Sequence, residues 1–331
     1  MRETRTGMRP LGGSWLDFFH WPGEGRYFSD ALRTFTEEQW RIKVREMAEL
    51  GMKYVVLTCS AVMRPGRAEA YFPTDLLPFP DDYVCRDPIG TVLSEADVLG
   101  MRVFVSCGWF GNMQRPWENM QSLEVEKRAF RAMEQLAARY GTHPSFYGWY
   151  LPDETGIRET YEPFFIDYVN RYTAFGRSLF PDGKMLIAPY GTRMVRCGSP
   201  YLSQLKTLQC DFIAYQDEVG VRKAQPEEMK TVFEGLRKMH DEAGGPALWA
   251  DLELFDFEGE VYASALIPAD IRRIERQIAA LSPYADELLC YEYVGIMNRP
   301  GTEAFCGRED SVSFQNAYRE LLETFRNAEE K

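Results

Sequence analysis

Apolar segments alternate with amphipathic segments along nearly the whole chain. The apolar segments resemble buried strands and span residues 11–19, 53–59, 101–107, 146–154, 184–189, 211–216, 247–254 and 287–294. The segments between them repeat apolar positions at helical spacing, over residues 36–50, 87–99, 122–140, 159–180, 199–209, 226–242, 268–281 and 311–323. Apolar strands that alternate with helices predict a parallel sheet with both faces covered.

Eight strand–helix units predict a single (β/α)8 barrel over residues 1–331, with a long irregular loop at about residues 60–86 after the second strand. The spacing of Thr36 and Gln39 is that of a capping box before the first helix. A doubly wound open sheet is the alternative fold. It usually has a glycine-rich turn after the first strand, where this chain offers only Gly23 and Gly25.

The fourth apolar segment ends in two acids. Residues 146–154 read FYGWYLPDE, and Pro152 cannot donate a hydrogen bond to a neighbouring strand, so the strand is expected to end near it. Asp153 and Glu154 follow at once. Because the C-terminal ends of barrel strands form the active site, both acids are candidates for catalysis. Asp153 has an alternative role as a helix N-cap.

The seventh apolar segment carries charged residues inside a strand. In ALWADLEL, residues 247–254, Trp249, Asp251 and Glu253 occupy alternate positions and therefore share one face. Two acids are hard to accommodate on the helix-covered side of a buried strand. They are expected to point into the barrel near its mouth, where hydrogen bonds or water can satisfy them.

These acids predict glycoside hydrolysis, which uses two carboxyl groups, one as proton donor and one as nucleophile or base. The fourth and seventh strands lie roughly across a barrel, so Glu154 is the predicted general acid/base and Glu253 the predicted nucleophile or base. Nearby acids would tune their pKa values. The candidates for that role are Asp153, Asp217, Asp251 and Glu292. Purely structural roles, as loop charges or as partners for backbone N–H groups, remain open for them.

Aromatic and polar residues gather at the predicted strand ends. An aromatic face suits the C–H face of a sugar ring, and polar side chains suit its hydroxyls. The predicted substrate-binding residues are Asp17, His20, Trp21, Trp109, Asn112, Tyr190, Tyr215, Gln216 and Trp249. The sequence therefore predicts a carbohydrate substrate. The alternative for each aromatic residue is a place in the core.

Charge and cysteine content narrow the function further. The net charge of −12 argues against nucleic acid or an anionic membrane surface as a partner. The seven cysteines show neither a disulfide framework nor zinc-ligand spacing, and no metal site or cofactor is predicted. A metal-dependent sugar isomerase or epimerase on the same fold stays open, since acids at strand ends can hold a divalent cation. A carbohydrate-binding barrel without turnover also stays open.

Four stretches together resemble one protein family. They read GSWLDFFHWPGEGRYF, FYGWYLPDE, FIAYQDEVGV and ALWADLELFDFE. The chain is similar to domain of unknown function 4434, a glycosidase-like TIM barrel, from about Gly12 to the last helix. The resemblance implies a barrel related to glycoside hydrolases. Retaining glycosidases of the large barrel clan carry Asn before the acid of the fourth strand, where this chain has Asp153.

Location and assembly are less constrained. The N-terminal segment MRETRTGMRPLGG carries charges with no apolar run after them, and no run of about 18 apolar residues follows elsewhere. A cytoplasmic location is expected for the chain as it stands, and export if a signal peptide has been removed. No feature of the sequence indicates an oligomeric state.

Overall fold

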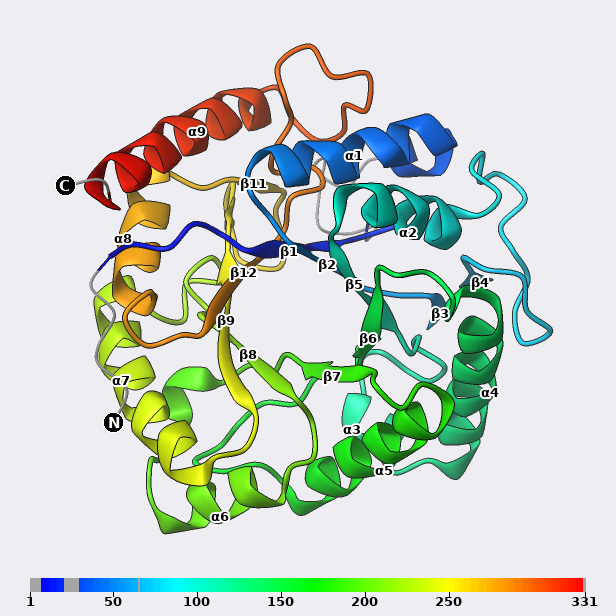
Figure 1. Ribbon diagram of the computed structural model, residues 1–331, viewed down its shortest axis with the longest axis horizontal. Helices are drawn as coiled ribbons and strands as arrows, with labels where there is room; N and C mark the ends of the chain where they lie inside the picture. Colours follow the sequence, from blue (N-terminus) through cyan, green and yellow to red (C-terminus); the bar gives the residue numbers. More distant parts are fainter. Residues whose placement is uncertain (1–6, 21–29, 65, 330–331) are drawn as a thin grey trace.

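The computed structural model describes residues 7–20, 30–64 and 66–329 and contains a closed barrel (Figure 1). Its strands are β1 (Gly13–Leu16), β2 (Tyr54–Leu57), β5 (Arg102–Ser106), β6 (Phe146–Tyr150), β7 (Lys184–Ile187), β8 (Phe212–Gln216), β9 (Ala247–Glu253) and β12 (Glu287–Tyr291). The strands follow chain order around the barrel, and every neighbouring pair is parallel. The predicted (β/α)8 barrel is therefore confirmed.

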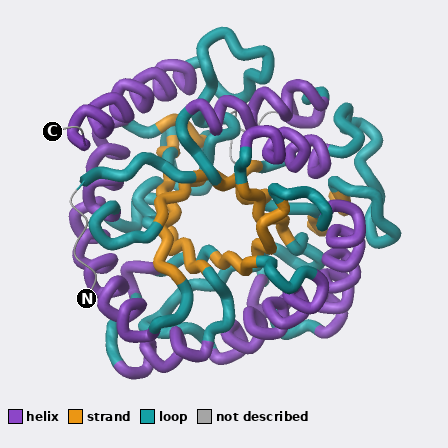
Figure 2. The backbone as a smooth tube through the Cα atoms, in the orientation of Figure 1, coloured by secondary structure: helices purple, strands orange, loops and turns teal. Residues whose placement is uncertain are grey.

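Helices enclose the ring of strands (Figure 2). The main ones are α1 (Glu37–Glu49), α2 (Pro88–Leu99), α4 (Leu123–Tyr140), α5 (Pro163–Leu179), α6 (Ser199–Thr207), α7 (Pro226–Ala243), α8 (Ile271–Leu281) and α9 (Asp310–Glu329). The predicted capping box is present at the start of α1, where Thr36 and Gln39 bond reciprocally. Within the described residues, no helix is long and apolar enough to cross a membrane.

One helix begins later than its sequence pattern predicts. The helix expected over residues 159–180 begins at Pro163. The residues before it instead form isolated β-bridges, Gly156 with Tyr190 and Glu159 with Val195. This segment is therefore tied to the loop after β7 at the rim of the barrel, which helical spacing alone does not reveal.

Short hairpins extend two of the loops at the C-terminal end of the barrel. The loop over residues 60–86 contains β3 (Ala61–Arg64) paired with β4 (Arg67–Ala70). After β9, β10 (Phe255–Phe257) pairs with β11 (Leu266–Pro268). Because Pro268 belongs to this hairpin, the helix expected from residue 268 begins only at Ile271. The remaining short elements are η2 (Asp30–Thr34), α3 (Pro116–Asn119) and η3 (Thr192–Met194).

An aromatic layer fills the barrel near the N-terminal ends of its strands. Its members are Tyr54, Phe104, Tyr147, Phe212 and Trp249. The rings of Phe212 and Trp249 stack with centroids 4.1 Å apart. A filled lower layer makes the barrel a packed core rather than a pore. The free space inside the barrel therefore lies toward the C-terminal ends of the strands.

Candidate active site

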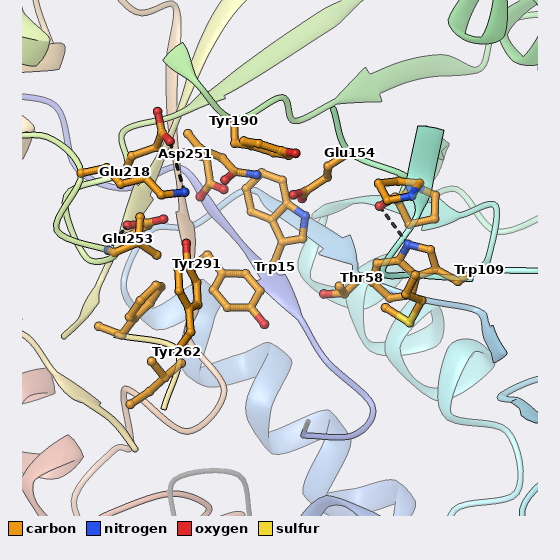
Figure 3. A pocket seen from close by; sticks show the side chains of 18 of the residues that line it. Trp15, Thr58, Trp109, Glu154, Tyr190, Glu218, Asp251, Glu253, Tyr262 and Tyr291 are labelled. Atoms are coloured by element: carbon orange, nitrogen blue, oxygen red, sulfur yellow. Dashed lines mark hydrogen bonds and ion pairs between the residues drawn. The ribbon is translucent and has the colours of Figure 1, made fainter. Parts of the chain in front are cut away.

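A cavity of about 570 Å³ opens at the C-terminal ends of the strands (Figure 3). This volume is in the range of small-molecule sites. The side chains that line it come from all parts of the chain and are Trp15, Thr58, Trp109, Met113, Gln114, Pro116, Trp117, Tyr150, Pro152, Glu154, Tyr190, Gln216, Glu218, Val221, Lys223, Asp251, Glu253, Phe255, Phe257, Tyr262, Leu266 and Tyr291. Four of these residues are acidic and one is basic, so the cavity combines aromatic walls with an excess of carboxyl groups.

Trp15 and Tyr150 bring aromatic rings to the base of the cavity. Both belong to the cluster inside the barrel, and their rings meet edge to face with centroids 5.8 Å apart. Trp15 lies on β1 and Tyr150 on β6, each at a position whose side chain points inward. The two rings therefore add aromatic surface to the cavity that contains the carboxyl groups.

Glu154 points into the cavity just beyond the end of β6 (Figure 3). The Tyr150 hydroxyl donates to Glu154 Oε1 at 3.3 Å. Burial raises the pKa of the Glu154 carboxyl to about 7, whereas hydrogen bonds from Gln216 and Tyr150 lower it. A carboxyl with this pKa can give up and regain a proton near neutral pH.

Two bonds fix the chain that leads to Glu154. The Trp109 indole N–H donates to the carbonyl oxygen of Pro152 at 3.0 Å. Asp153 turns away from the cavity, and its Oδ1 accepts a hydrogen bond from Asn119 at 2.8 Å. These partners lie on the loop after β5 and on α3, so this loop holds the end of β6 in place.

Asp251 and Glu253 both reach the cavity from β9. Burial raises the pKa of Asp251 well above its ordinary value, and the carboxyls of Glu253, Asp217 and Glu154, in that order, raise it further. Burial also raises the pKa of Glu253 to about 8, with a further contribution from Asp217. Glu253 Oε2 accepts a hydrogen bond from the Val221 N–H at 2.7 Å. Among the described residues, Asp251 Oδ1 has no hydrogen-bond partner.

Several predicted site residues line this cavity. They are Glu154, Glu253, Asp251, Trp109, Tyr190 and Gln216. Gln216 lies beside Asp251 in the pairing of β8 with β9, and it also contributes a hydrogen bond to Glu154. The structure thus brings the acids of β6 and β9 together around one amide side chain.

The predicted residues Asp17 and His20 lie behind the cavity wall. Asp17 accepts a hydrogen bond at 2.8 Å from the hydroxyl of Tyr291, which itself lines the cavity. Burial raises the pKa of Asp17 to about 6. His20 is buried near Val294, and burial lowers its pKa to about 3. Glu292 is also buried and does not line the cavity.

Asp217 supports the strands from behind. Its Oδ1 accepts hydrogen bonds from the backbone N–H groups of Val219 and Glu253, each at 3.2 Å. Its Oδ2 accepts a hydrogen bond from the side chain of Gln277. Burial raises its pKa to about 6, and these bonds act in the opposite direction. Asp217 therefore ties the end of β8 to β9 and α8 without lining the cavity.

Tyr215 and Trp249 lie away from the cavity for reasons of strand geometry. Tyr215 points toward the helices, because its neighbour Gln216 points into the barrel. Its hydroxyl is hydrogen-bonded to Tyr201 and to His240. Trp249 points inward but one layer below Asp251, within the aromatic layer.

The two remaining predicted residues lie elsewhere. Asn112 is exposed, and its Oδ1 accepts the backbone N–H of Gln114 at 3.0 Å, which stabilises its own turn. Trp21 lies outside the described residues. Among the described residues, no group of three or more His, Cys, Asp or Glu side chains is arranged to hold a metal ion.

Sequence reasoning missed several residues that line the cavity. Trp15 and Tyr150 could have been found from the sequence, because they alternate along their strands with residues that face the helices, which places their side chains inside the barrel. Lys223 and Tyr262 carry none, since they lie in loops whose course depends on tertiary contacts. Figure 3 shows the ring of Tyr262 directed from below toward the region of Glu218.

Several solved structures that share this fold are described as glycosidases. A "putative alpha-L-fucosidase" from Bacteroides thetaiotaomicron is 16% identical with a TM-score of 0.72, covering 98% of this chain and 96% of that chain. A glycoside hydrolase family 5 mannosidase from Rhizomucor miehei is 10% identical with a TM-score of 0.56, covering 97% and 95%. An endo-1,4-beta-mannanase from the same fungus is 10% identical with a TM-score of 0.55, covering 96% and 100%. At these identities, the likeness shows a shared barrel fold.

Comparison at the level of sequence gives a family. A search of curated proteins finds no match to the chain. The model of the family described as domain of unknown function 4434 matches residues 11–304, which include every strand of the barrel. The resemblance found in the sequence motifs is thus confirmed over most of the chain. The chain belongs to the family of domain of unknown function 4434.

Proposed function

We propose that the protein is a glycoside hydrolase that uses Glu154 and Asp251 as its two carboxyl groups. One observation carries the proposal. The two side chains come from β6 and β9, line the same cavity, and lie close enough for Glu154 to raise the pKa of Asp251. A pair of acids at opposite sides of a sugar-sized cavity is the arrangement that glycoside hydrolysis requires.

The choice of Asp251 over Glu253 follows from their contacts. Glu253 was the partner expected from sequence, and it also lines the cavity. Its Oε2, however, accepts the Val221 N–H, and after burial the largest influence on its pKa is Asp217. The pKa of Asp251 responds to Glu154. Figure 3 shows Asp251 and Glu154 directed toward the space beside Trp15 and Tyr190, with Glu253 set to one side.

The environments of the two carboxyls suggest their roles. Glu154, with its pKa near neutrality, donates a proton to the glycosidic oxygen. Asp251 then acts as the nucleophile or as the base for a water molecule. Burial and nearby acids disfavour the ionised form of Asp251. Positive charge that develops on the sugar ring in the transition state offsets this cost, so the carboxylate stabilises the transition state more than the ground state.

The cavity walls fit a sugar ring. Tyr190 and Trp15 offer aromatic faces, and Gln216 offers an amide beside the acids. The names of the structural neighbours suggest which sugars to test first. Two of them are described as a mannosidase and a mannanase, and one as a fucosidase. We therefore include mannosides and fucosides among the first substrates.

The proposal is tested by hydrolysis of aryl glycosides. The panel contains 4-nitrophenyl and 2,4-dinitrophenyl α- and β-glycosides of mannose, fucose, glucose and galactose, together with manno-oligosaccharides. We expect Glu154→Gln and Asp251→Asn each to lower turnover by about a hundredfold to ten-thousandfold. Glu234→Gln is the matched control, because Glu234 pairs with Lys238 on the exposed face of α7, at 2.9 Å.

Leaving-group dependence separates the two roles. A 2,4-dinitrophenolate departs without protonation, so Glu154→Gln should act on that substrate far better than on the 4-nitrophenyl glycoside. Asp251→Asn should lose both activities. If Glu253→Gln abolishes turnover while Asp251→Asn does not, Glu253 is the second catalytic carboxyl. If the wild-type protein hydrolyses none of the panel, the proposal of a glycoside hydrolase fails.

A further inference from the structure

The loop after β8 holds two charged side chains at fixed positions in the cavity wall. The carbonyl oxygen of Glu218 accepts hydrogen bonds from the backbone N–H groups of Lys223, at 3.0 Å, and Ala224, at 3.2 Å. Glu218 has a φ of 54°, which is uncommon for a residue other than glycine. Such backbone conformations persist where surrounding contacts enforce them, and they are concentrated at functional sites.

The loop is also anchored to β9. The Val221 N–H donates to Glu253 Oε2 at 2.7 Å. Gly220 lies so close to the strand that an added Cβ would be 2.6 Å from the Phe255 carbonyl oxygen and 2.8 Å from Glu253 Cβ. Only glycine permits this approach without displacement of the loop. The position of the two charged side chains is therefore set by the strand that carries Asp251.

Glu218 has unused hydrogen-bonding capacity inside the cavity wall. The residue is only 2% exposed and lines the cavity, yet its Oε2 has no hydrogen-bond partner among the residues that the structure describes. Its Oε1 lies 3.8 Å from Lys223 Nζ. A buried carboxylate oxygen without a donor is costly, so a ligand that supplies a donor gains affinity there.

Lys223 lies at the centre of the same group of side chains. Its Nζ is 5.7 Å from the ring centroid of Tyr190 and 5.6 Å from that of Tyr262. Figure 3 labels Glu218, Tyr190 and Tyr262, the three residues that contact this ammonium group. An ammonium group has three donors: one is hydrogen-bonded to Tyr262, and the 3.8 Å contact with Glu218 leaves at least one more for a ligand. The ammonium can therefore donate to a ligand oxygen.

We propose that Glu218 and Lys223 form a subsite that recognises two adjacent hydroxyl groups of a neutral sugar. One hydroxyl donates to Glu218 Oε2, and the oxygen of the next accepts from Lys223 Nζ. The ring of Tyr190 covers the apolar face between them. This inference rests on the proposed function, because it names the class of sugar that the same cavity would take.

Charge decides between a neutral sugar and a uronic acid. The cavity lining contains four carboxyl groups, those of Glu154, Glu218, Asp251 and Glu253, and a single ammonium group, that of Lys223. Lys223 is already paired with Glu218. At pH 8 the carboxyl of Glu154 is above its pKa of about 7 and that of Glu253 is at its pKa of about 8, so both add negative charge to the cavity. A sugar carboxylate would therefore meet like charge there, and this repulsion disfavours it.

The test compares matched ligands that differ only at C6. Binding of the methyl glycosides of glucose, galactose and mannose, and of the corresponding methyl uronides, is measured by calorimetry on the wild-type protein at pH 8. We expect at least one neutral glycoside to bind at least tenfold more tightly than its uronide. Glu218→Gln and Lys223→Met should each weaken binding of that glycoside by about tenfold or more.

Selectivity separates recognition from a role in folding of the loop. Glu218→Gln removes a negative charge, so it should lower the ratio of the affinity for the neutral glycoside to the affinity for its uronide. Lys223→Met removes a positive charge and should raise that ratio. If the pair only stabilised the loop, each variant would weaken binding of the neutral glycoside and of the uronide by the same factor. Glu234→Gln and Lys238→Met, which remove charges from an exposed pair on α7, should leave both affinities unchanged.

Three results would overturn the subsite. In the first, the wild-type protein binds the uronides as tightly as the neutral glycosides or more tightly. In the second, both variants bind the neutral glycoside as the wild type does. In the third, the wild-type protein binds none of the glycosides. Because calorimetry needs no turnover, these results are distinct from a failure of catalysis. If the protein binds the neutral sugars as expected but hydrolyses none of them, the proposed hydrolase activity is refuted and the proposed subsite stands.

Discussion

Replacement of Glu154 by Gln should stabilise the protein at alkaline pH while it removes the proposed proton donor. The physical reason is the buried carboxyl, whose ordinary pKa of 4.5 rises to about 7 in the folded protein, mainly through burial. A raised pKa means that the folded state binds the proton more tightly than the unfolded state does. The stability that this proton contributes is complete below about pH 4.5 and is lost as the pH rises to about 7.

The size of the effect follows from the shift. A rise from 4.5 to about 7 corresponds to about 3 kcal/mol at 1.36 kcal/mol for each pKa unit. Gln has no proton to lose. The free energy of unfolding of Glu154→Gln, relative to that of the wild type, should therefore rise by about 3 kcal/mol between pH 4.5 and pH 8. For a chain of 331 residues, with about 2.1 cal/mol/K of unfolding entropy per residue, this gain corresponds to about 5 °C in Tm.

The assay is thermal unfolding of the wild type and of Glu154→Gln across that pH range, checked by urea unfolding at its two ends. The difference between the two proteins is the measured quantity, because titrating groups that do not interact with Glu154 contribute equally to both. Asp251, whose pKa Glu154 raises, adds to the difference in the same direction. Glu234→Gln is the control. The Lys238 ion pair lowers the pKa of Glu234, so this variant should show a small difference of the opposite sign. A Glu154→Gln difference that is independent of pH would refute the argument.

Three further changes test other parts of the structure. Lys43→Met leaves the carboxylate of Glu46 buried without its ammonium partner at 2.9 Å. In urea unfolding, this change should lower the free energy of unfolding by about 3–5 kcal/mol. Lys238→Met, which removes one member of an exposed pair, should not lower it measurably. Gly220→Ala places a Cβ 2.6 Å from a backbone oxygen and should raise KM about tenfold through displacement of its loop. Trp109→Phe removes the 3.0 Å bond that holds the end of β6, and it should lower kcat about tenfold with a smaller change in KM.

The fold could be predicted because its rules are local and repeated. On β9, Leu248, Ala250 and Leu252 face the helices, while Trp249 and Asp251 face the interior, as the alternation in the sequence predicts. Each apolar strand is followed by a helical pattern, and parallel strands joined in this way have few possible topologies. The number and order of the barrel strands therefore follow from the chain.

The composition of the site was less predictable. Tyr215 was expected at the substrate because it lies near a strand end, yet it is one residue out of phase with the inward positions. Lys223 and Tyr262 were not expected, because their places depend on hydrogen bonds between loops that are far apart in sequence. The choice between Glu253 and Asp251 as the proposed partner of Glu154 depends on contacts in the folded protein. The spacing of the two acids in the sequence does not reveal these contacts.

The register of β9 links the three parts of the proposed site. Its inward residues have separate places: Trp249 fills the barrel, Asp251 lines the cavity as the proposed catalytic partner of Glu154, and Glu253 anchors the loop that carries the proposed subsite. The strand pairs with β8 and with β12 along five positions each, so its register is fixed from both sides. A slip by one residue would turn all three side chains toward the helices at once. The position of the proposed catalytic carboxyl and that of the proposed subsite are thus determined by the same backbone pairing.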